Sequence, residues 1–450
     1  MTDRMSFSIS RRDFLKKTTL AASALTIPSI VPASVLGAYS PGQKINLGFI
    51  GVGGMGMQNL KGFLPKEKVQ VVAVCDVEEE SNQYGGYYTG RDLGRAPAKR
   101  NVEKFYANKK NIIQYKGCDA YEDFRDVLAR KDIDAVVVCT PDHWHVPISV
   151  AAAKAGKDIY CEKPLTLTIG QGRVLADVVK RYKTVFQTGS HQRSSGLFRN
   201  ACELVRNNRI GQLKKIHIQI PGNNCFCQPA WKPMEVPKTF NYDMWLGPAP
   251  YAPYHKQRCH YDFRFILDYS GGQMTNWGAH HFDIAQWGSG HDDSGPVEIQ
   301  GSGEFPKSGL FTTCTKVNKL TYRYANGVEI NTKMGGSDVM FEGTDGWIRV
   351  SRESISASDP EILTSKIGPD EIHLYESNDH RENFIECIKT RKDPICNAET
   401  GHRSATVCHL GNIAMLLGRK LKWDPARERF TNDDEANRMI NRAMRAPWIL

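Results

Sequence analysis

The chain has 450 residues, enough for about two or three domains with substantial hydrophobic cores. Hydrophobic residues make up 40% of the composition and charged residues 24%, as in ordinary globular proteins. The formal net charge of +10 is modest, and the sequence has no basic block with interleaved aromatic residues beyond its start. Nucleic acid is therefore not expected as a partner.

The first forty residues have the composition of a targeting segment. The run SRRDFLKK at positions 10–17 contains a twin-arginine pair, and an uncharged stretch follows from Thr18 to Ala38. This arrangement resembles a Tat export signal, which predicts the Tat machinery as a partner and a periplasmic or otherwise exported protein. An alternative is an uncleaved signal that anchors the chain in a membrane, although Pro28 and Pro32 interrupt the apolar stretch. We assign residues 1–38 to the signal peptide.

A glycine-rich turn follows the first predicted strand, residues 45–50. The Gly-x-Gly-x-x-Gly spacing allows a tight turn, close approach of the backbone to a pyrophosphate, and close packing of helix on strand. A second apolar run ends at Asp76, whose carboxylate would bind a ribose 2′-hydroxyl and repel a 2′-phosphate, which favours NAD over NADP. The predicted dinucleotide site comprises Gly51, Gly53, Gly54, Met55, Gly56 and Asp76.

Short apolar runs alternate with amphipathic ones up to about residue 189. Strands are expected at residues 135–139 and 158–161, and helices at residues 146–155 and 169–182. This alternation is typical of an α/β fold with a doubly wound parallel sheet, so we assign residues 39–189 to an NAD-binding Rossmann domain. The Tyr- and Gly-rich stretch between residues 78 and 110 is expected to be a surface excursion.

The pattern changes after residue 190. Strand-like runs at residues 213–220, 320–324, 328–333 and 347–350 are separated by glycine turns, and Asn326-Gly327 is a hairpin signal. These features predict an α+β domain with a largely antiparallel open sheet over residues 190–420. Residues 421–450 are expected to form a C-terminal tail packed on a surface or on a neighbouring chain.

Polar residues follow two of the predicted parallel strands. Thr140, Pro141 and His145 come after the valine-rich strand, and Glu162-Lys163-Pro164 follows the next one. Ligands bind beyond the carboxyl ends of strands in open parallel sheets, so both groups are expected beside the cofactor. Lys163 could there hydrogen-bond a substrate hydroxyl and lower its pKa, whereas the alternative is a solvated loop lysine.

The twelve cysteines do not form a recognisable metal-binding or disulfide pattern. Cys225 and Cys227 are a close pair that could in principle bind a metal with Cys259 or His260. No second Cys-x-x-Cys pair or paired-histidine spacing supports zinc, so no metal is expected.

Taken together, these motifs resemble those of the Gfo/Idh/MocA family of oxidoreductases. The resemblance rests on the glycine turn, on Thr140-Pro141 with His145, and on Glu162-Lys163-Pro164, and it extends through YDMWLGP at 242–248 and GHRS at 401–404. The family implies a Rossmann domain followed by an α+β domain whose open sheet often forms an oligomer interface, here in a homodimer or homotetramer. It also implies NAD or NADP as cofactor and a sugar, cyclitol or glycoside as substrate.

The resemblance further implies that Lys163 is catalytic and that a histidine follows a Gly-Gly turn, with an aspartate four residues before it. In this chain the histidine is His280, and Asn276 occupies the position of the aspartate. Asparagine can orient a hydroxyl but cannot carry a negative charge, so Lys163 and His280 are expected to carry more of the proton transfer. We expect His280 to act as general base or acid and Lys163 to polarise the reacting oxygen. Asp283, one helical turn further on, could orient His280. Candidate contacts to the substrate are His191, Gln192, Arg193, Arg264 and His281.

We therefore predict an exported NAD-dependent oxidoreductase that transfers hydride at a ring carbinol carbon. Because Tat export carries folded proteins, the cofactor is expected to be tightly bound and to be recycled within each catalytic cycle. A closed cycle also fits an alternative, a redox-neutral glycosidase resembling glycoside hydrolase family 109, although that group's site motif is not evident around residues 276–280. A second alternative is a non-catalytic sugar-binding protein that retains its nucleotide.

Overall fold

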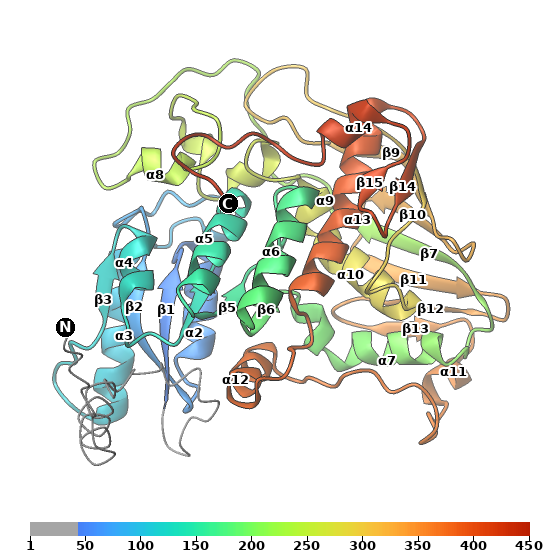
Figure 1. Ribbon diagram of the computed structural model, residues 1–450, viewed down its shortest axis with the longest axis horizontal. Helices are drawn as coiled ribbons and strands as arrows, with labels where there is room; N and C mark the ends of the chain where they lie inside the picture. Colours follow the sequence, from blue (N-terminus) through green and yellow to red (C-terminus); the bar gives the residue numbers. More distant parts are fainter. Residues whose placement is uncertain (1–43) are drawn as a thin grey trace, which may run out of the picture.

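The computed structural model describes residues 44–450, which form two domains built on separate β-sheets (Figure 1). In the first domain, the strand order is β3-β2-β1-β4-β5-β6 and all neighbouring strands are parallel. The strands are β1 (Ile45–Ile50), β2 (Val69–Cys75), β3 (Asp119–Tyr121), β4 (Ala135–Val138), β5 (Asp158–Cys161) and β6 (Phe186–Thr188). The strand order reverses between β1 and β4, which is the point where open parallel sheets bind ligands. The predicted Rossmann fold is confirmed.

Helices cover both faces of this sheet, as continuous apolar strands such as β4 require. The helices are α2 (Gly54–Phe63), α3 (Arg95–Lys110), α4 (Phe124–Ala129), α5 (Asp142–Lys154) and α6 (Ile169–Tyr182). The presence of α3 corrects the expectation for residues 78–110. Its buried side chains, Val102 and Tyr106 among them, pack into the core beside β2, so only the part before α3 is an excursion.

The second domain contains a nine-stranded mixed sheet in the order β13-β12-β11-β7-β10-β9-β8-β14-β15. Only β7 and β10 pair in parallel among these described strands, which confirms the predicted, largely antiparallel sheet. The strands are β7 (Leu213–Ile220), β8 (Glu298–Glu304), β9 (Lys316–Arg323), β10 (Glu329–Met334), β11 (Asp338–Gly343), β12 (Trp347–Val350), β13 (Ile355–Ala357), β14 (Leu421–Asp424) and β15 (Arg429–Phe430).

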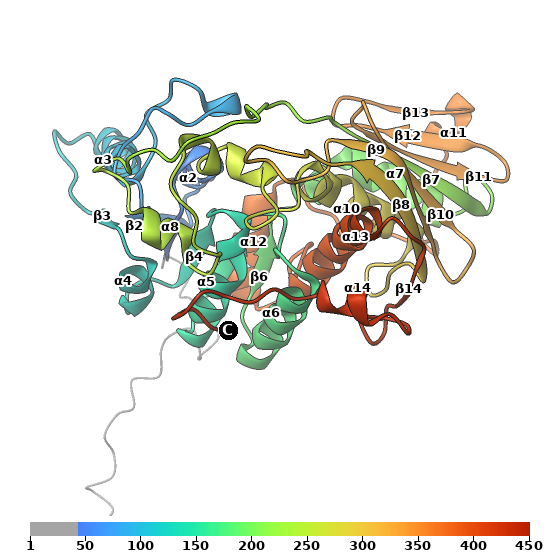
Figure 2. The same ribbon diagram turned by 90° about the horizontal axis from the view of Figure 1, so that it is seen from above.

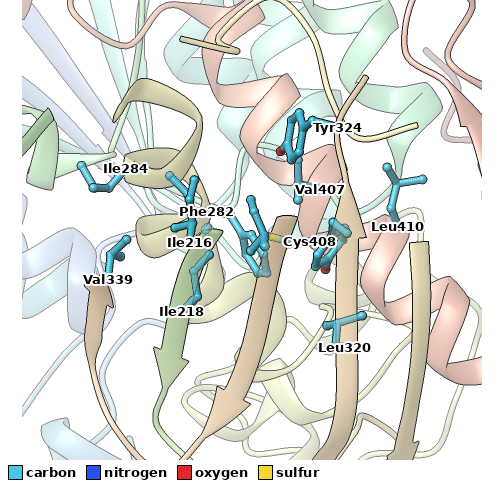
Figure 3. Close-up of a cluster of buried hydrophobic side chains, with 14 of the residues drawn as sticks. Ile216, Ile218, Phe282, Ile284, Leu320, Tyr324, Val339, Val407, Cys408 and Leu410 are labelled. Atoms are coloured by element: carbon cyan, nitrogen blue, oxygen red, sulfur yellow. The ribbon is translucent and has the colours of Figure 1, made fainter. Parts of the chain in front are cut away.

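Three helices pack on one face of this sheet: α7 (Gly196–Arg206), α10 (Gly278–Ser289) and α13 (Ala398–Leu417) (Figures 1 and 2). Figure 3 shows Phe282 of α10 between Ile216 and Ile218 of β7 and the side chains of α13, and its ring also meets that of Tyr322 at 5.3 Å. This hydrophobic core holds α10 firmly on the sheet. It thereby places the first turn of α10, which carries His280, at the boundary with the Rossmann domain. The remaining helices are α8 (Tyr242–Leu246), α9 (Gln273–Asn276), α11 (Pro360–Thr364), α12 (His380–Thr390) and α14 (Asp434–Arg438).

The C-terminal residues are integrated into both domains, which corrects the predicted tail. Residues 421–424 form β14, which pairs with β8 and therefore belongs to the second sheet. The last residues then return to the Rossmann domain, seen in dark red above α5 in Figure 1. There the ring of Trp448 packs against that of Trp144 at 4.7 Å and near Phe124.

The predictions on export, membrane anchoring, disulfides and metal concern residues both outside and inside the described range. The Tat signal assigned to residues 1–38 lies outside the described residues. Within residues 44–450, no helix is both long enough and apolar enough to cross a bilayer. In the same range all the cysteines are free thiols, and no three side chains of metal-binding type gather at one place.

Candidate functional site

A cavity of about 640 Å³ lies beyond the carboxyl ends of the parallel strands, between the two domains. It brings together most of the predicted site residues from distant parts of the chain. Those that line it are Gly51, Gly53, Gly54, Met55, Asp76, Thr140, Pro141, His145, Glu162, Lys163, His191, Gln192, Arg264, Asn276 and His280. Gly56, Arg193 and His281 do not line it.

The glycine turn forms one end of the cavity. Its close packing is possible because glycine has no Cβ atom. Gly51 has φ of +82°, and a Cβ atom there would lie 2.7 Å from the backbone of Cys139 and Thr140. A Cβ at Gly56 would overlap the carbonyl oxygen of Gly51, so Gly56 serves the packing of α2 on β1. The first turn of α2 contains no acidic residue, and its amides remain suited to a phosphate. This cradle fits the diphosphate of a dinucleotide.

Asp76 follows β2 beside the same turn. Its carboxylate accepts hydrogen bonds from the amides of Val52 (2.7 Å) and Glu78 (3.0 Å). Burial raises the pKa of Asp76, while these backbone amides act in the opposite direction. The carboxylate therefore has a fixed orientation at the position where a Rossmann fold binds the adenosine ribose.

Three tyrosines from the excursion before α3 cover the glycine turn, a feature that the sequence analysis missed. A Cβ at Gly53 would lie 2.7 Å from the ring of Tyr84, and one at Gly54 would overlap the ring of Tyr88. Tyr87 meets Tyr261 of the second domain at 5.6 Å between ring centres. We call Tyr84, Tyr87 and Tyr88 the tyrosine cover. The sequence held two signs of this contact. Gly54 stands at a position where the Gly-x-Gly-x-x-Gly spacing does not require glycine, and the stretch before α3 is rich in tyrosine.

Lys163 and Asn276 meet at the other end of the cavity, from different domains. The Lys163 Nζ donates hydrogen bonds to the Asn276 Oδ1 (2.9 Å) and to its backbone carbonyl (3.1 Å). The Asn276 Nδ2 donates to Gln273 Oε1 (3.0 Å), which fixes the amide orientation. Burial lowers the pKa of Lys163 to about 8, with Glu162 opposing the shift and Arg264 adding to it. A neutral amine is therefore accessible near physiological pH.

The neutral amide of Asn276 differs in its electrostatic effect from the aspartate that the family resemblance led us to expect at this position. A carboxylate at this position would lie about 3 Å from the Lys163 nitrogen and would favour its charged form. The neutral amide accepts the same hydrogen bond without this effect. Asn276 thus helps to keep the pKa of Lys163 low.

His280 lines the cavity near Lys163 and is 7% exposed. Burial lowers its pKa well below the ordinary value, and the charges of Lys163 and Arg352 lower it further, so the ring is neutral. Among the described residues, its Nδ1 has no hydrogen-bond partner. Asp283 does not orient it, contrary to expectation, because the Asp283 carboxylate is bound by Arg193 and by Ser404. That nitrogen is itself buried, so it is the residue's place in the cavity lining, and not this atom, that brings the ring to a ligand.

Glu162 and His145 support the loops that carry Lys163. The Glu162 carboxylate accepts from Asn59 Nδ2 (2.8 Å); although burial acts to raise its pKa, His191 and Lys163 bring it down to about 2. The two ring nitrogens of His145 lie 2.7 Å from the carbonyl oxygen of Pro164 and 2.9 Å from that of Thr140. His145 therefore joins the loops after β4 and β5.

Arg193 and His281 lie away from the cavity, which corrects their assignment as substrate contacts. The buried Arg193 guanidinium pairs with Asp283 (2.8 Å) and with Asp292 (2.7 Å). His281 stacks on Trp277 with an interplanar angle of 14°, and its Nε2 lies 3.3 Å from Ser337 Oγ. Adjacent residues on a helix point in different directions, so only His280 faces the cavity. The sequence alone could not show that Arg193 pairs with Asp283 and Asp292, because both lie far from it along the chain and only folding brings them together.

Two family models match the chain. One is described as "Oxidoreductase family, NAD-binding Rossmann fold" and covers residues 45–190; the other is "Oxidoreductase family, C-terminal alpha/beta domain" and covers residues 224–450. The chain belongs to the Gfo/Idh/MocA oxidoreductase family. The predicted family resemblance is confirmed.

Curated relatives and solved structures extend the comparison. A "Glycosyl hydrolase family 109 protein" from Shewanella sp. (strain W3-18-1) is 29% identical over 189 residues, which is 39% of this chain and 38% of the relative. An aldose-aldose oxidoreductase from Caulobacter crescentus complexed with glycerol has a TM-score of 0.58 and 17% identity, over 84% of this chain and 100% of that one. A levoglucosan dehydrogenase in complex with NADH and L-sorbose gives a TM-score of 0.58 and 17% identity, over 84% and 99%. The two structures share the fold of this chain.

The buried ion pairs of Arg193 predict a structural role that can be measured. Arg193→Ala would leave the Asp283 carboxylate buried without its cation, so we expect the free energy of unfolding to fall by about 3–5 kcal/mol. As a control, Arg100→Ala removes an exposed pair with Glu80 and is expected to cost at most about 1 kcal/mol. Chemical denaturation of the three proteins gives both values, and equal losses in the two variants would contradict the assignment.

Proposed function

We propose that the protein is an NAD-dependent oxidoreductase that acts on a CH–OH group of a sugar, cyclitol or glycoside. The observation that carries this proposal is the cavity itself, because one space joins the glycine turn and Asp76 to Lys163, Asn276 and His280. Membership of the family supports the nicotinamide cofactor. The fixed carboxylate of Asp76 supports NAD over NADP, since it would repel a 2′-phosphate.

The side chains at the reaction end have separate roles in this proposal. Bound NAD would supply the hydride acceptor for the carbinol carbon and, in the reverse direction, the hydride donor. The neutral Lys163 amine accepts the hydroxyl proton, and the Asn276 oxygen holds that amine in place. Neutral His280 lines the cavity beside Lys163 and hydrogen-bonds the reacting oxygen. Lys163 thus takes the base role that the sequence analysis assigned to His280.

We further propose that the cofactor stays bound and is recycled, with the carbonyl group of a second sugar taking the hydride back when the first sugar is oxidised. The tyrosine cover supports this, because Tyr84 and Tyr88 lie on the glycine turn and Tyr87 reaches the second domain. The twin-arginine run at residues 10–17 supports export by the Tat machinery to the periplasm or beyond, where a retained cofactor would be needed. The family's use of the open sheet supports a homo-oligomer.

A second candidate is a redox-neutral glycosidase. The 29% identity to glycoside hydrolase family 109 proteins over 39% of this chain supports it, as does cofactor retention. In such a cycle, oxidation at one ring carbon acidifies the neighbouring C–H, elimination expels the aglycone, water adds, and reduction restores the carbinol. The net change is hydrolysis, with no external oxidant.

The Lys163 pKa predicts the pH dependence of sugar oxidation. The neutral amine is the proton acceptor, so kcat/KM should rise as the pH increases through about 8. Asn276→Asp places a carboxylate beside the ammonium and should move this rise upward by about 1–3 pH units. Asn108→Asp, on the exposed face of α3, is the matched control and should leave the profile in place. A profile that Asn276→Asp does not shift would exclude Lys163 as the titrating base.

The tyrosine cover predicts slow release of the nucleotide. Tyr88→Ala removes a ring that lies on Gly54, and we expect NAD to dissociate about tenfold faster, because the lost contact is worth roughly 1.4 kcal/mol. Tyr182→Ala, at a residue 44% exposed on α6, is the control. Stopped-flow displacement of bound NADH by NAD gives the rates. Equal rates in both variants would show that the cover does not retain the cofactor.

Turnover in deuterated water separates the two candidate functions. If a nitrophenyl glycoside is cleaved by oxidation and elimination, the sugar released should carry solvent deuterium at the carbon beside the oxidised one. Simple dehydrogenation leaves that carbon unlabelled. Mass spectrometry of the product decides between them, and cleavage without any deuterium at that carbon would contradict the second candidate.

A further inference from the structure

Three basic side chains line the reaction end of the cavity: Lys163, Arg264 and Arg352. The carboxylates nearby are already hydrogen-bonded within the protein: Glu162 to Asn59, and Asp142 to Ser270. These carboxylates lie against neutral donors and not against the two arginines.

Arg352 is the better placed of the two to meet a substrate. It follows β12, and its guanidinium lies 4.5 Å from the centre of the Trp277 ring, three residues before His280. Its Nε donates to the Gln192 side-chain oxygen (3.2 Å) in the amide orientation that also lets Gln192 donate to the His280 carbonyl (3.1 Å). The ring and the amide hold the guanidinium beside His280, but neither neutralises it.

Neither arginine has an ion-pair partner in the part of the chain that the structure describes. No carboxylate oxygen of residues 44–450 lies within 4.0 Å of either guanidinium, although Glu353 acts on Arg352 from further away. The Arg264 guanidinium lies over the Tyr261 ring at 4.1 Å and donates to the Tyr261 carbonyl. Arginine stays charged in proteins, and Arg352 is an exposed residue, so its guanidinium is available to an anionic ligand.

We propose, on the basis of the proposed function, that the substrate is an acidic carbohydrate whose carboxylate is bound by Arg352. With Nε occupied by Gln192, the two terminal nitrogens of the guanidinium present a planar pair of donors, which matches the two oxygens of a carboxylate. The reacting carbinol then lies between Lys163 and His280, and Arg264 adds to the positive potential. A uronic acid or a uronate-bearing glycoside satisfies this arrangement.

Comparison of matched sugars tests this inference. D-glucuronate and D-galacturonate are compared with D-glucose and D-galactose as reductants of the NAD-loaded protein, followed by nicotinamide absorbance. We expect the second-order rate constant for reduction of the bound NAD to be about 10- to 100-fold higher for the uronates, as a hydrogen-bonded charge pair implies. Arg352→Gln should bring the acidic-to-neutral ratio close to one. Arg349→Gln, at a half-exposed position on β12, should keep the ratio.

Calorimetric binding of the same sugars and of NAD separates failure of this inference from failure of the proposed function. Equal turnover of acidic and neutral sugars would overturn the inference and leave the function standing. Uronate binding that depends on Arg352, without any reduction of the nicotinamide, would overturn the function and leave the acidic site standing. If Arg352→Gln weakens NAD and leaves the sugar ratio unchanged, the arginine serves the nucleotide and the inference is wrong.

Discussion

The hydrogen bonds between Lys163 and Asn276 are the contact on which the reaction end of the cavity depends. Lys163 follows a strand of the Rossmann sheet, and Asn276 lies at the end of α9 in the second domain. Neither domain alone contains both groups. The core beneath α10, in which Phe282 packs on β7, holds the second half of the site in register with the first. The returning C-terminal segment, with Trp448 on Trp144, adds a further link between the domains.

The two ends of the cavity differ in their chemistry, and each suits its proposed task. At the nucleotide end, missing side chains at Gly51 and Gly53 create room, and aromatic rings cover it. At the reaction end, burial keeps His280 neutral and lowers the pKa of Lys163 to about 8. The amide of Asn276 supports the second effect, because it accepts a hydrogen bond without adding charge. An amide at position 276 is therefore compatible with the lowered pKa of Lys163.

Local sequence patterns predicted the Rossmann sheet, the second sheet, and the placing of Lys163 beside the glycine turn, whereas Asn276 and His280 were assigned to the site only through the family resemblance. They failed where a role depends on partners that are distant in sequence. Arg193 looks like a ligand contact until Asp283 and Asp292 are seen beside it. Arg352 gave no signal, because only folding brings the residue after β12 next to Trp277. The tyrosine cover was predicted to lie on the surface, because in the sequence β2 separates these tyrosines from the glycine turn that they contact.

The central claim is that a sugar hydrogen passes directly to a nucleotide held in this cavity. Its most direct test uses sugars and uronates that carry deuterium on their ring carbons, mixed with the NAD-loaded protein and quenched within one turnover. Mass spectrometry of the released nucleotide should find deuterium on the nicotinamide, and Lys163→Met should abolish the transfer while NAD remains bound. Turnover of the labelled sugar with no deuterium on the nucleotide would contradict the account.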